Sequence, residues 1–225
     1  MRINLNLSSY LLLILMFSMQ ANVASAVQED AQTLIVEHSG KLVTALKEQS
    51  AAIKLDNQIA YKLVEDIVLP HVDFSRVARL VLGKYWRQAN PEQRTRFTNE
   101  FKGFLVRTYV TAMIEFSDQI VSHADSVKYL PFRNNNEDEV SVRMLINLPD
   151  RPPVQINYSL FQDGSEGKWK IYDLAVEGIS LATTYRSSFS TQIRRGGIDD
   201  LINKLAERNA QAVENKTVSI SAPAK

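Results

Sequence analysis

The sequence predicts an α+β fold, in which helices pack against one curved antiparallel sheet of four strands. Two changes in the spacing of apolar residues indicate this fold. Apolar residues recur at helical spacing through residues 27–118, alternate with polar residues through 119–177, and return to helical spacing through 178–209. Short polar turns separate the four alternating runs, which is typical of an antiparallel meander with one apolar face. A helix laid across such a curved sheet makes a cone, and cones of this kind often have an apolar interior.

Residues 1–26 are expected to be a secretory signal peptide rather than part of the fold. Arg2 is the only charged residue before Glu29, and the apolar run at 10–17 is too short to span a bilayer. The small residues of Ala24–Ala26 have the pattern of a cleavage site, so we expect cleavage near Ala26. The mature protein is then expected to be soluble in a bacterial periplasm.

The mature chain is expected to contain one domain over residues 27–209, followed by a disordered tail over 210–225. Without Arg2 it has 25 basic and 25 acidic residues. This balance argues against broad binding of nucleic acid, which requires a basic surface. The chain contains no cysteine, so disulfides, thiolate chemistry and a lipid anchor on cysteine are excluded.

Three helices are expected before residue 90. Residues 29–49 have helical periodicity. Asn57 is expected to cap a second helix, which Leu69-Pro70 ends, and Asp73 to cap a short third helix that starts at Phe74. Asn90-Pro91 combines a capping residue with proline at the first helical position, so it predicts the start of a fourth helix.

The second half of this fourth helix, which covers residues 90–118, is apolar on every side. Its first turns are amphipathic, but its later apolar residues surround the helix axis: Val106, Tyr109, Val110, Met113, Ile114 and Phe116. A helix of this kind has to be covered on all sides. We therefore expect its C-terminal end to lie inside the molecule or beside a cavity that an apolar ligand fills.

The four strands are expected at residues 121–129, 140–146, 154–160 and 168–176, with Leu130-Pro131 ending the first. After Gly178 an apolar stripe at every fourth position predicts a helix, formed by Leu181, Tyr185, Phe189 and Ile193. Gly196-Gly197 is expected to end this helix because glycine permits positive φ. A last short helix is expected from Ile198 to Leu205.

Few residues suit catalysis or metal binding. His38, His71 and His123 lie in separate segments without the spacing of metal ligands, so we expect no metal site. Ser180 follows a strand and precedes a helix, where a capping role is expected. Asp173 lies on an otherwise apolar strand, so it is either a sheet-edge carboxylate that bonds to the backbone or to an arginine, or a buried general base. We predict no catalytic residue.

Several segments resemble the MlaC (toluene-tolerance) family of periplasmic phospholipid carriers. They occur in family order through nearly all of the mature chain, at residues 69–74, 82–86, 90–94, 151–154, 169–173, 177–181, 185–186 and 196–201. The most specific are the stretches WKIYD at 169–173 and EGISL at 177–181. The resemblance implies a cone like that of nuclear transport factor 2 with additional N-terminal helices.

The resemblance also implies a function and partners. The protein would shuttle phospholipid between an inner-membrane ABC transport complex and an outer-membrane lipoprotein–porin complex, in the Mla pathway that maintains outer-membrane lipid asymmetry in Gram-negative bacteria. Phospholipid would be its cargo, and we expect no cofactor and a monomer. Apart from the resemblance, Arg143, Arg151 and Arg186 are either solvated surface charges or groups that attract the phosphate of the lipid.

Candidate acyl-chain residues lie on three elements. They are Phe101, Phe104, Leu105, Tyr109 and Met113 on the fourth helix, Val142, Met144, Ile146, Ile156, Tyr158 and Ile171 on the sheet, and Leu181, Tyr185 and Phe189 on the returning helix. Two alternatives remain. One is an enzyme for an apolar substrate with Asp173 as its base, and the other is an adaptor that carries nothing and has a solid core.

Overall fold

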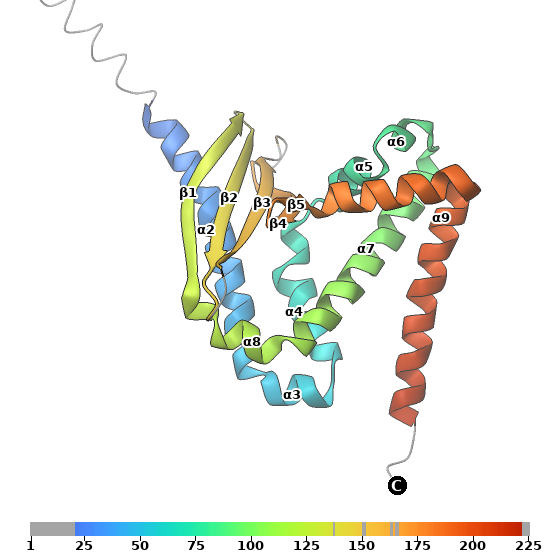
Figure 1. The fold of residues 1–225 in the computed structure, drawn as a ribbon, viewed down its shortest axis with the longest axis horizontal. Helices are drawn as coiled ribbons and strands as arrows, with labels where there is room; N and C mark the ends of the chain where they lie inside the picture. The colour runs from blue at the N-terminus through green and yellow to red at the C-terminus, as the bar shows by residue number, and fades with distance from the viewer. Residues whose placement is uncertain (1–20, 137, 150–151, 163, 165–166, 222–225) are drawn as a thin grey trace, which may run out of the picture.

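An antiparallel sheet and the helices around it form the part of the chain that the computed structural model describes, which is residues 21–136, 138–149, 152–162, 164 and 167–221 (Figure 1). The helices before the sheet are α2 (Ala21–Glu48), α3 (Ser50–Leu55), α4 (Gln58–Ile67), the 3-10 turn η1 (Leu69–His71), α5 (Phe74–Leu82), α6 (Lys84–Gln88), α7 (Pro91–Glu115), α8 (Ser117–Ser122) and the 3-10 turn η2 (Ala124–Ser126). Residues 1–20 of the expected signal peptide lie outside the described residues.

The sheet contains β1 (Val127–Asn136), β2 (Glu139–Ile146), β3 (Val154–Gln162), β4 (Trp169–Val176) and β5 (Ile179–Ser180), in the order β1-β2-β3-β4-β5. All neighbouring strands are antiparallel. The expected α+β class and meander are therefore confirmed. The two-residue strand β5 was not expected. It pairs with the end of β4 across a tight turn, in which Gly178 has a φ of 77°.

The predicted strand at 121–129 is wrong in its first half. Residues 117–122 form α8, and β1 begins only at Val127. Ile120 and Val121 pack against a cluster formed by α2, α3, α4 and α7. The helical conformation therefore gives both apolar residues a place to pack. β1 also continues through Pro131, which was expected to end it. β1 is an edge strand, and its pairing with β2 is irregular between Leu130 and Arg133, where proline is tolerated.

Most of the expected helix caps are present. Asn90 and Gln93 form a reciprocal capping box at the start of α7, and the Asp73 side chain accepts a hydrogen bond from the backbone N–H of Arg76. The cap predicted at Asn57 is wrong, because the carboxylate of Asp56 accepts the bond from Gln58 N–H instead.

The last helix, α9 (Leu181–Ser221), bends at Gly197, where φ is 84°. Its first part runs away from the sheet, and its second part turns back alongside α7 (Figure 1). The bend is at the predicted position. The second part extends to Ser221, past the position near Ala210 at which we expected a tail to begin.

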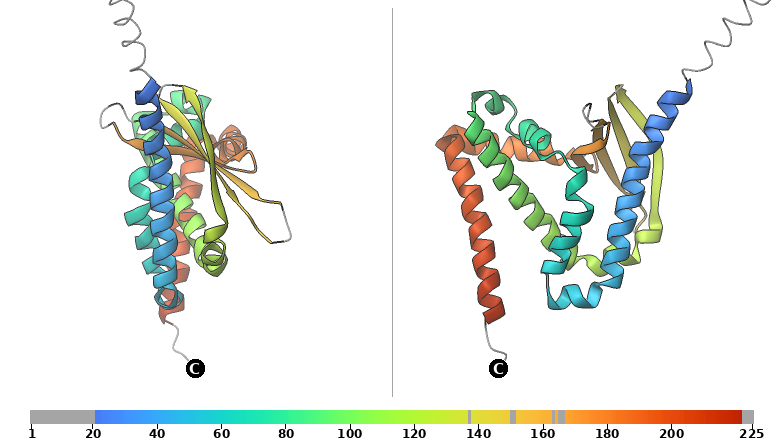
Figure 2. Two further views of the ribbon diagram at one scale, coloured as in Figure 1. Left: turned by 90° about the vertical axis from the view of Figure 1, so that its left-hand side faces the viewer. Right: turned by 180° about the vertical axis from the view of Figure 1, so that it is seen from behind.

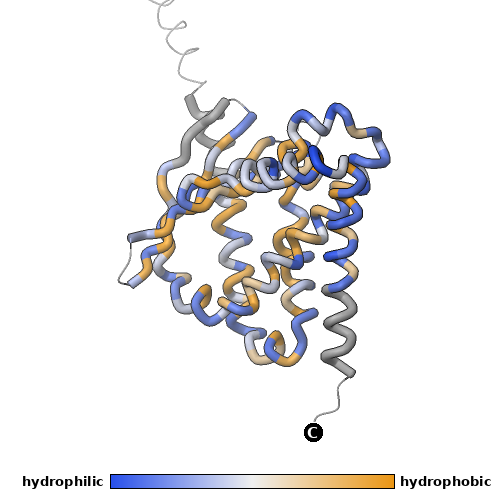
Figure 3. The backbone as a smooth tube through the Cα atoms, turned by 45° about the vertical axis from the view of Figure 1, so that its right-hand side comes forward, coloured by the Kyte–Doolittle hydropathy of each residue, from blue (hydrophilic) through white to orange (hydrophobic). Residues whose placement is uncertain are grey.

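In the part of the chain that the structure describes, the buried apolar residues form three clusters rather than one. The first joins α5, α6, α7 and α9, with Phe97 and Phe101 at its centre. The second joins α2 to β2, β3 and β4, and the third joins α2, α3, α4 and α7. A domain of this size usually has one continuous core. The separation implies that a space lies between the clusters, and Figure 3 shows hydrophobic segments of the sheet and helices around the middle of the molecule.

Candidate functional site

A cavity of about 300 Å³ lies where the three clusters would otherwise meet. Its walls come from α2, α4, η1, α5, α7, β3, β4 and α9, and almost all of the lining side chains are apolar. This volume is within the range of small-molecule pockets, about 300–1,000 Å³. The cavity therefore suits an apolar ligand with few polar groups.

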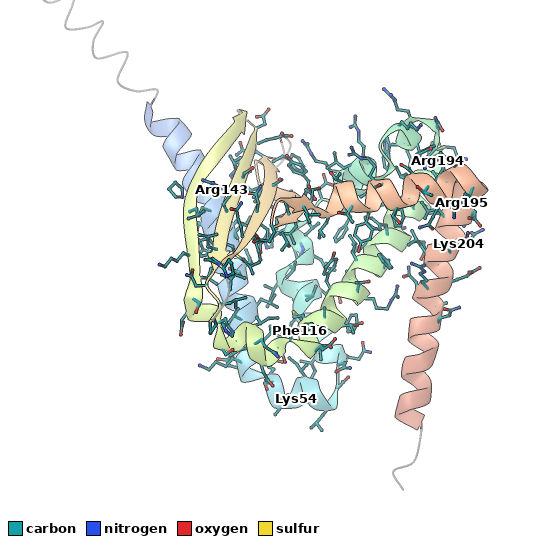
Figure 4. The ribbon with its side chains drawn as sticks, in the orientation of Figure 1. Lys54, Phe116, Arg143, Arg194, Arg195 and Lys204 are labelled. Carbon is teal, nitrogen blue, oxygen red and sulfur yellow. The ribbon has the colours of Figure 1, made fainter. Side chains whose placement is uncertain are left out.

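The apolar second half of α7 is positioned as the sequence predicted. Val106, Tyr109, Val110 and Met113 all line the cavity. Farther along, Phe116 is half exposed at the junction of α7 and α8 (Figure 4). The expectation of a cavity beside this helix is confirmed, but the helix is not covered on every side, since Tyr109 is 41% and Phe116 is 50% exposed.

Eight of the predicted acyl-chain residues lie on the cavity wall. They are Phe101, Leu105, Tyr109, Met113, Tyr158, Ile171, Leu181 and Tyr185. Six lie elsewhere. Phe104 and Phe189 pack in the first cluster, between α5, α6, α7 and α9. Val142 packs in the second cluster with Ala31 and Ile35 of α2, and Met144 and Ile146 line a second groove. Ile156 shares a sheet face with Met144, its partner across the β2–β3 pair, but lines neither space.

On the sheet, the position of Val142 results from where α2 lies and not from a wrong strand phase. Val142 and Tyr158 are paired across β2 and β3, so they lie on the same face of the sheet. The helix α2 lies along this face (Figure 2) and covers Val142, whereas Tyr158 stays open to the cavity. The predicted alternation of β2 is correct at Val140, Val142 and Met144, which are all buried.

Sequence reasoning missed the wall that α4, η1 and α5 contribute. The lining residues from this part of the chain are Val64, Val68, Leu69, Val72, Phe74, Val77 and Val81. The apolar stripe of α5 was visible in the sequence at Phe74, Val77 and Val81. An apolar stripe looks the same whether it faces a cavity or a solid core, so the pattern alone could not assign these residues.

Asp173 lines the cavity, and both oxygens of its carboxylate accept hydrogen bonds from the protein itself. One oxygen accepts hydrogen bonds from the backbone N–H groups of Leu174 and Ala182, and the other accepts one from the Ser180 hydroxyl at 2.5 Å. Ser180 in turn accepts from Thr183 N–H, which confirms its predicted capping role. Asp173 therefore joins β4 to the start of α9, as the backbone-bonding alternative expected.

The other polar groups on the wall are phenols. Burial raises the pKa of Tyr158 to about 12, so this hydroxyl stays protonated at neutral pH. Burial is also the main cause that raises the pKa values of the Tyr109 and Tyr172 hydroxyls above their ordinary value of 10. Such groups can position a neutral acceptor in the cavity.

Two of the three arginines considered for phosphate binding donate hydrogen bonds to backbone carbonyls. Arg143, on the sheet (Figure 4), donates to the carbonyl of Pro131 at 2.7 Å, and Arg186 donates to that of Leu80 at 2.6 Å. Both bonds stabilise local structure. Arg151 lies outside the described residues.

A second groove, of about 1,000 Å³, lies between α2, α8 and the β1–β2 side of the sheet. Val36 and Val43 of α2, Phe116 and Ile120, and Met144 and Ile146 of β2 contribute to its walls. Leu42 lines both this groove and the cavity. The two spaces are thus neighbours, with α2 between them.

The described residues offer neither a cluster of metal ligands nor a membrane-spanning helix. They contain no group of three or more histidine, cysteine, aspartate or glutamate side chains that could hold a metal ion. None of the described helices has both the length and the apolar composition needed to cross a membrane.

Comparisons with known proteins agree on one family. The MlaC protein family matches residues 37–207. The intermembrane phospholipid transport system binding protein MlaC of Haemophilus influenzae is 25% identical over 190 residues, which are 84% of this chain and 87% of that protein. The toluene tolerance protein ttg2D of Pseudomonas putida is 27% identical over 160 residues, or 71% of each chain.

A solved structure supports the same assignment. The phospholipid-binding protein of Ralstonia solanacearum, solved in complex with a phospholipid, is 31% identical and superposes with a TM-score of 0.69. The match covers 81% of this chain and 98% of that one. Because the family match spans most of the described residues and the fold agrees, this chain belongs to the MlaC family of phospholipid-binding proteins.

Proposed function

We propose that the protein is a periplasmic carrier that encloses the acyl chains of a phospholipid in the cavity between its three core clusters. The observation that carries the proposal is the apolar wall of this cavity, to which α2, α4, α5, α7, α9 and the sheet all contribute. The relatives are named for phospholipid transport or phospholipid binding, which supports the same cargo.

The size of the hydrophobic effect explains why the chains must be enclosed. A diacyl lipid has on the order of 30 methylenes, and each is worth about 0.8 kcal/mol on burial. The total, about 25 kcal/mol, exceeds the ceiling of non-covalent affinity at about 18–21 kcal/mol. A carrier that left the chains in water could not extract the lipid, whereas one that buries them exchanges with a bilayer at little net cost.

The direction of lipid transport must then be set by partner proteins. We propose that the protein shuttles between an inner-membrane ABC transport complex and an outer-membrane lipoprotein–porin complex, and so maintains outer-membrane lipid asymmetry. The name of the Haemophilus relative, which refers to an intermembrane transport system, supports this cycle. A nearly balanced transfer is what such a shuttle requires, since it must both take up and release its cargo.

The alternatives are less well supported. An enzyme would need a free base in the cavity, but both oxygens of Asp173 accept hydrogen bonds from groups of the protein itself. An adaptor without cargo would need no apolar cavity.

Native mass spectrometry tests the proposal. Protein purified without added lipid, or incubated with phospholipid vesicles, should carry a phospholipid mass. Leu105→Trp fills the cavity and should abolish loading, whereas Thr111→Trp, at an exposed position of the same helix, should not. If unsubstituted protein carries no phospholipid and takes none from vesicles, the carrier function is wrong.

A further inference from the structure

Two histidine rings meet where α2 and η1 lie next to each other. His38 belongs to α2 and His71 to η1, and the centroids of their imidazole rings are 3.7 Å apart. The Nδ1 atom of His38 is buried and has no hydrogen-bond partner. The rings therefore contact each other by packing, at a place that is partly closed to water.

This contact lies beside the cavity wall. Leu42 follows His38 by one turn of α2, and Leu69 and Val72 flank His71 along the chain. All three of these apolar residues line the cavity. We call the boundary between Leu42 on one side and Leu69 and Val72 on the other the seam. Leu42 also lines the second groove, so the seam separates the cavity from that groove.

On its other side η1 is bonded to the sheet. The Lys170 ammonium donates to the carbonyl of Pro70 at 2.8 Å, and the backbone N–H of Asp73 donates to the carbonyl of Ile171 at 3.0 Å. Val72 and Ile171 also form a parallel bridge. Within the residues that the structure describes, no hydrogen bond joins α2 to η1. Packing alone, with the histidine rings as part of it, holds the seam closed.

A proton on either ring adds charge to a place that already has positive neighbours. Lys41 of α2 and Lys170 of β4 both act on His71. Burial, and then the charges of His38, Lys170 and Lys41, lower the pKa of His71 below its ordinary 6.5. His71 is therefore neutral at pH 7.5 and takes up a proton only in acid.

The acidic groups around the pair have other partners. Glu37, which precedes His38 on α2, pairs with Lys41 at 2.5 Å. The carboxylate of Asp73 caps α5, and Asp66 of α4, the helix that packs against η1, pairs with Lys62. Two protonated rings would thus face each other with little compensation, and like charges about 4 Å apart repel even in water.

We propose that protonation of the His38–His71 pair separates α2 from η1 and so speeds release of the bound lipid. With neutral rings the seam is closed, and with charged rings the cavity opens toward the second groove. This inference rests on the proposed carrier function and adds a proton-dependent step of release to it.

The test measures release at two pH values. Protein loaded with a pyrene-labelled phosphatidylcholine is mixed with excess unlabelled phosphatidylcholine vesicles, and the loss of label from the protein is followed by fluorescence. The charge of this headgroup is the same at pH 7.5 and pH 5.5. Release from unsubstituted protein should be about fivefold faster at pH 5.5, which corresponds to the repulsion of two like charges about 4 Å apart in water.

Three variants of the pair separate its charge from its shape. His38→Gln and His71→Gln keep a polar side chain that does not titrate, so each should release lipid at the slow rate at both pH values. His38→Lys places a permanent positive charge beside His71 and should release lipid fast already at pH 7.5.

His123→Gln is the matched control. His123 is the third histidine of the chain, and it interacts with Gln119 and Ser122 at the end of α8. This variant should keep the full acceleration in acid. Near-UV circular dichroism, recorded at both pH values, should show that the protein stays folded.

Several outcomes would overturn the inference. They are equal release rates of unsubstituted protein at the two pH values, an acceleration that survives in His38→Gln and His71→Gln, and a loss of the near-UV signal at pH 5.5, which would assign release to unfolding. Failure of the protein to take up the labelled lipid at all would instead contradict the carrier function itself.

Discussion

The imidazole rings of His38 on α2 and His71 on η1 pack together, with their centroids 3.7 Å apart and their planes inclined by 38°. The sequence placed these histidines in separate segments and did not indicate the contact. Burial lowers the pKa of His71 below its ordinary 6.5, and the nearby positive charges of His38, Lys170 and Lys41 act in the same direction, against Glu37. Protonation of His71 is therefore coupled to folding.

The protein should lose stability as the pH falls from 7.5 to 5.5. In the unfolded chain His71 takes up a proton near its ordinary pKa, whereas in the folded chain it resists protonation. The unfolded state therefore binds more protons below about pH 6.5, and the free energy of unfolding decreases with pH there. Urea unfolding across this range should show a falling midpoint, and His71→Gln should flatten the dependence.

His123→Gln is the control for this experiment. His123 follows α8 and interacts with Gln119 and Ser122, away from the His38–His71 pair. This variant should keep the full pH dependence. An unchanged slope in His71→Gln would show that other groups cause the effect.

Arg76 should be a stabilising residue that connects α5 to the sheet. Its guanidinium lies 4.1 Å from the ring centroid of Phe161 and 4.7 Å from that of Tyr172, and it forms an ion pair with Glu139 of β2. Because the pair is only partly buried, we expect Arg76→Ala to lower the free energy of unfolding by about 1–2 kcal/mol.

Lys62→Ala provides the comparison for Arg76. Lys62 pairs with Asp66 on the exposed surface of α4, where water screens the ion pair, so we expect a much smaller loss of stability than for Arg76→Ala. Chemical denaturation of both variants measures the difference. Equal losses would mean that the two aromatic rings add nothing to the Arg76 interaction.

Asp173 should contribute to the stability of the fold and should not act as a catalytic base. Asp173→Ala leaves Ala182 N–H and the Ser180 hydroxyl without their acceptor, so we expect a loss of about 1–3 kcal/mol in the free energy of unfolding. Ser180→Ala removes the cap of α9 and should cost about 1 kcal/mol. Lipid bound per folded molecule, counted by native mass spectrometry, should be unchanged in both variants. Full stability of Asp173→Ala together with lost lipid binding would contradict the capping role.

Periodicity predicted which side of each element is apolar, but not which element covers it. The strand phase of β2 and β3 was correct, yet Val142 is covered by α2 and Tyr158 is open to the cavity. Phe104 and Phe101 lie three residues apart on α7, and only Phe101 reaches the cavity wall. Both outcomes depend on how distant segments pack. A cavity forms where several elements do not pack against one another, so the apolar pattern of any single element cannot predict it.

Helix α8 shows that secondary structure, too, can depend on contacts with distant segments. Ile120 and Val121 fit either a strand or a short helix. The third core cluster, which includes Val110 and Leu46, gives both residues a place to pack in the helical form. Tertiary packing therefore decides the local structure here, and the sequence alone favoured the wrong alternative.

Alanine in place of glycine should change the stability of the protein in opposite directions at two positions. Gly197 has φ 84° and ψ 176°, a conformation almost closed to residues with a Cβ atom, although no atom lies within 4 Å of the position that a Cβ would take. Gly197→Ala is therefore strained by its backbone alone and should cost about 1–3 kcal/mol. Gly40 lies inside α2, also with open space around its Cβ position, so Gly40→Ala should stabilise the protein by about 0.5–1 kcal/mol.

The bend at Gly197 brings the second part of α9 back onto the first cluster, between α5, α6 and α7. Leu201, Ile202 and Leu205, all almost fully buried, reach this cluster only because α9 turns at this position. If alanine straightens the helix, these residues leave Phe97 and Phe101, and the α7 wall of the cavity loses its support. Thermal unfolding should then show a clearly lower midpoint for Gly197→Ala and a higher one for Gly40→Ala. Shifts of the same sign in the two variants would mean that helix propensity, and not the left-handed bend, controls the result.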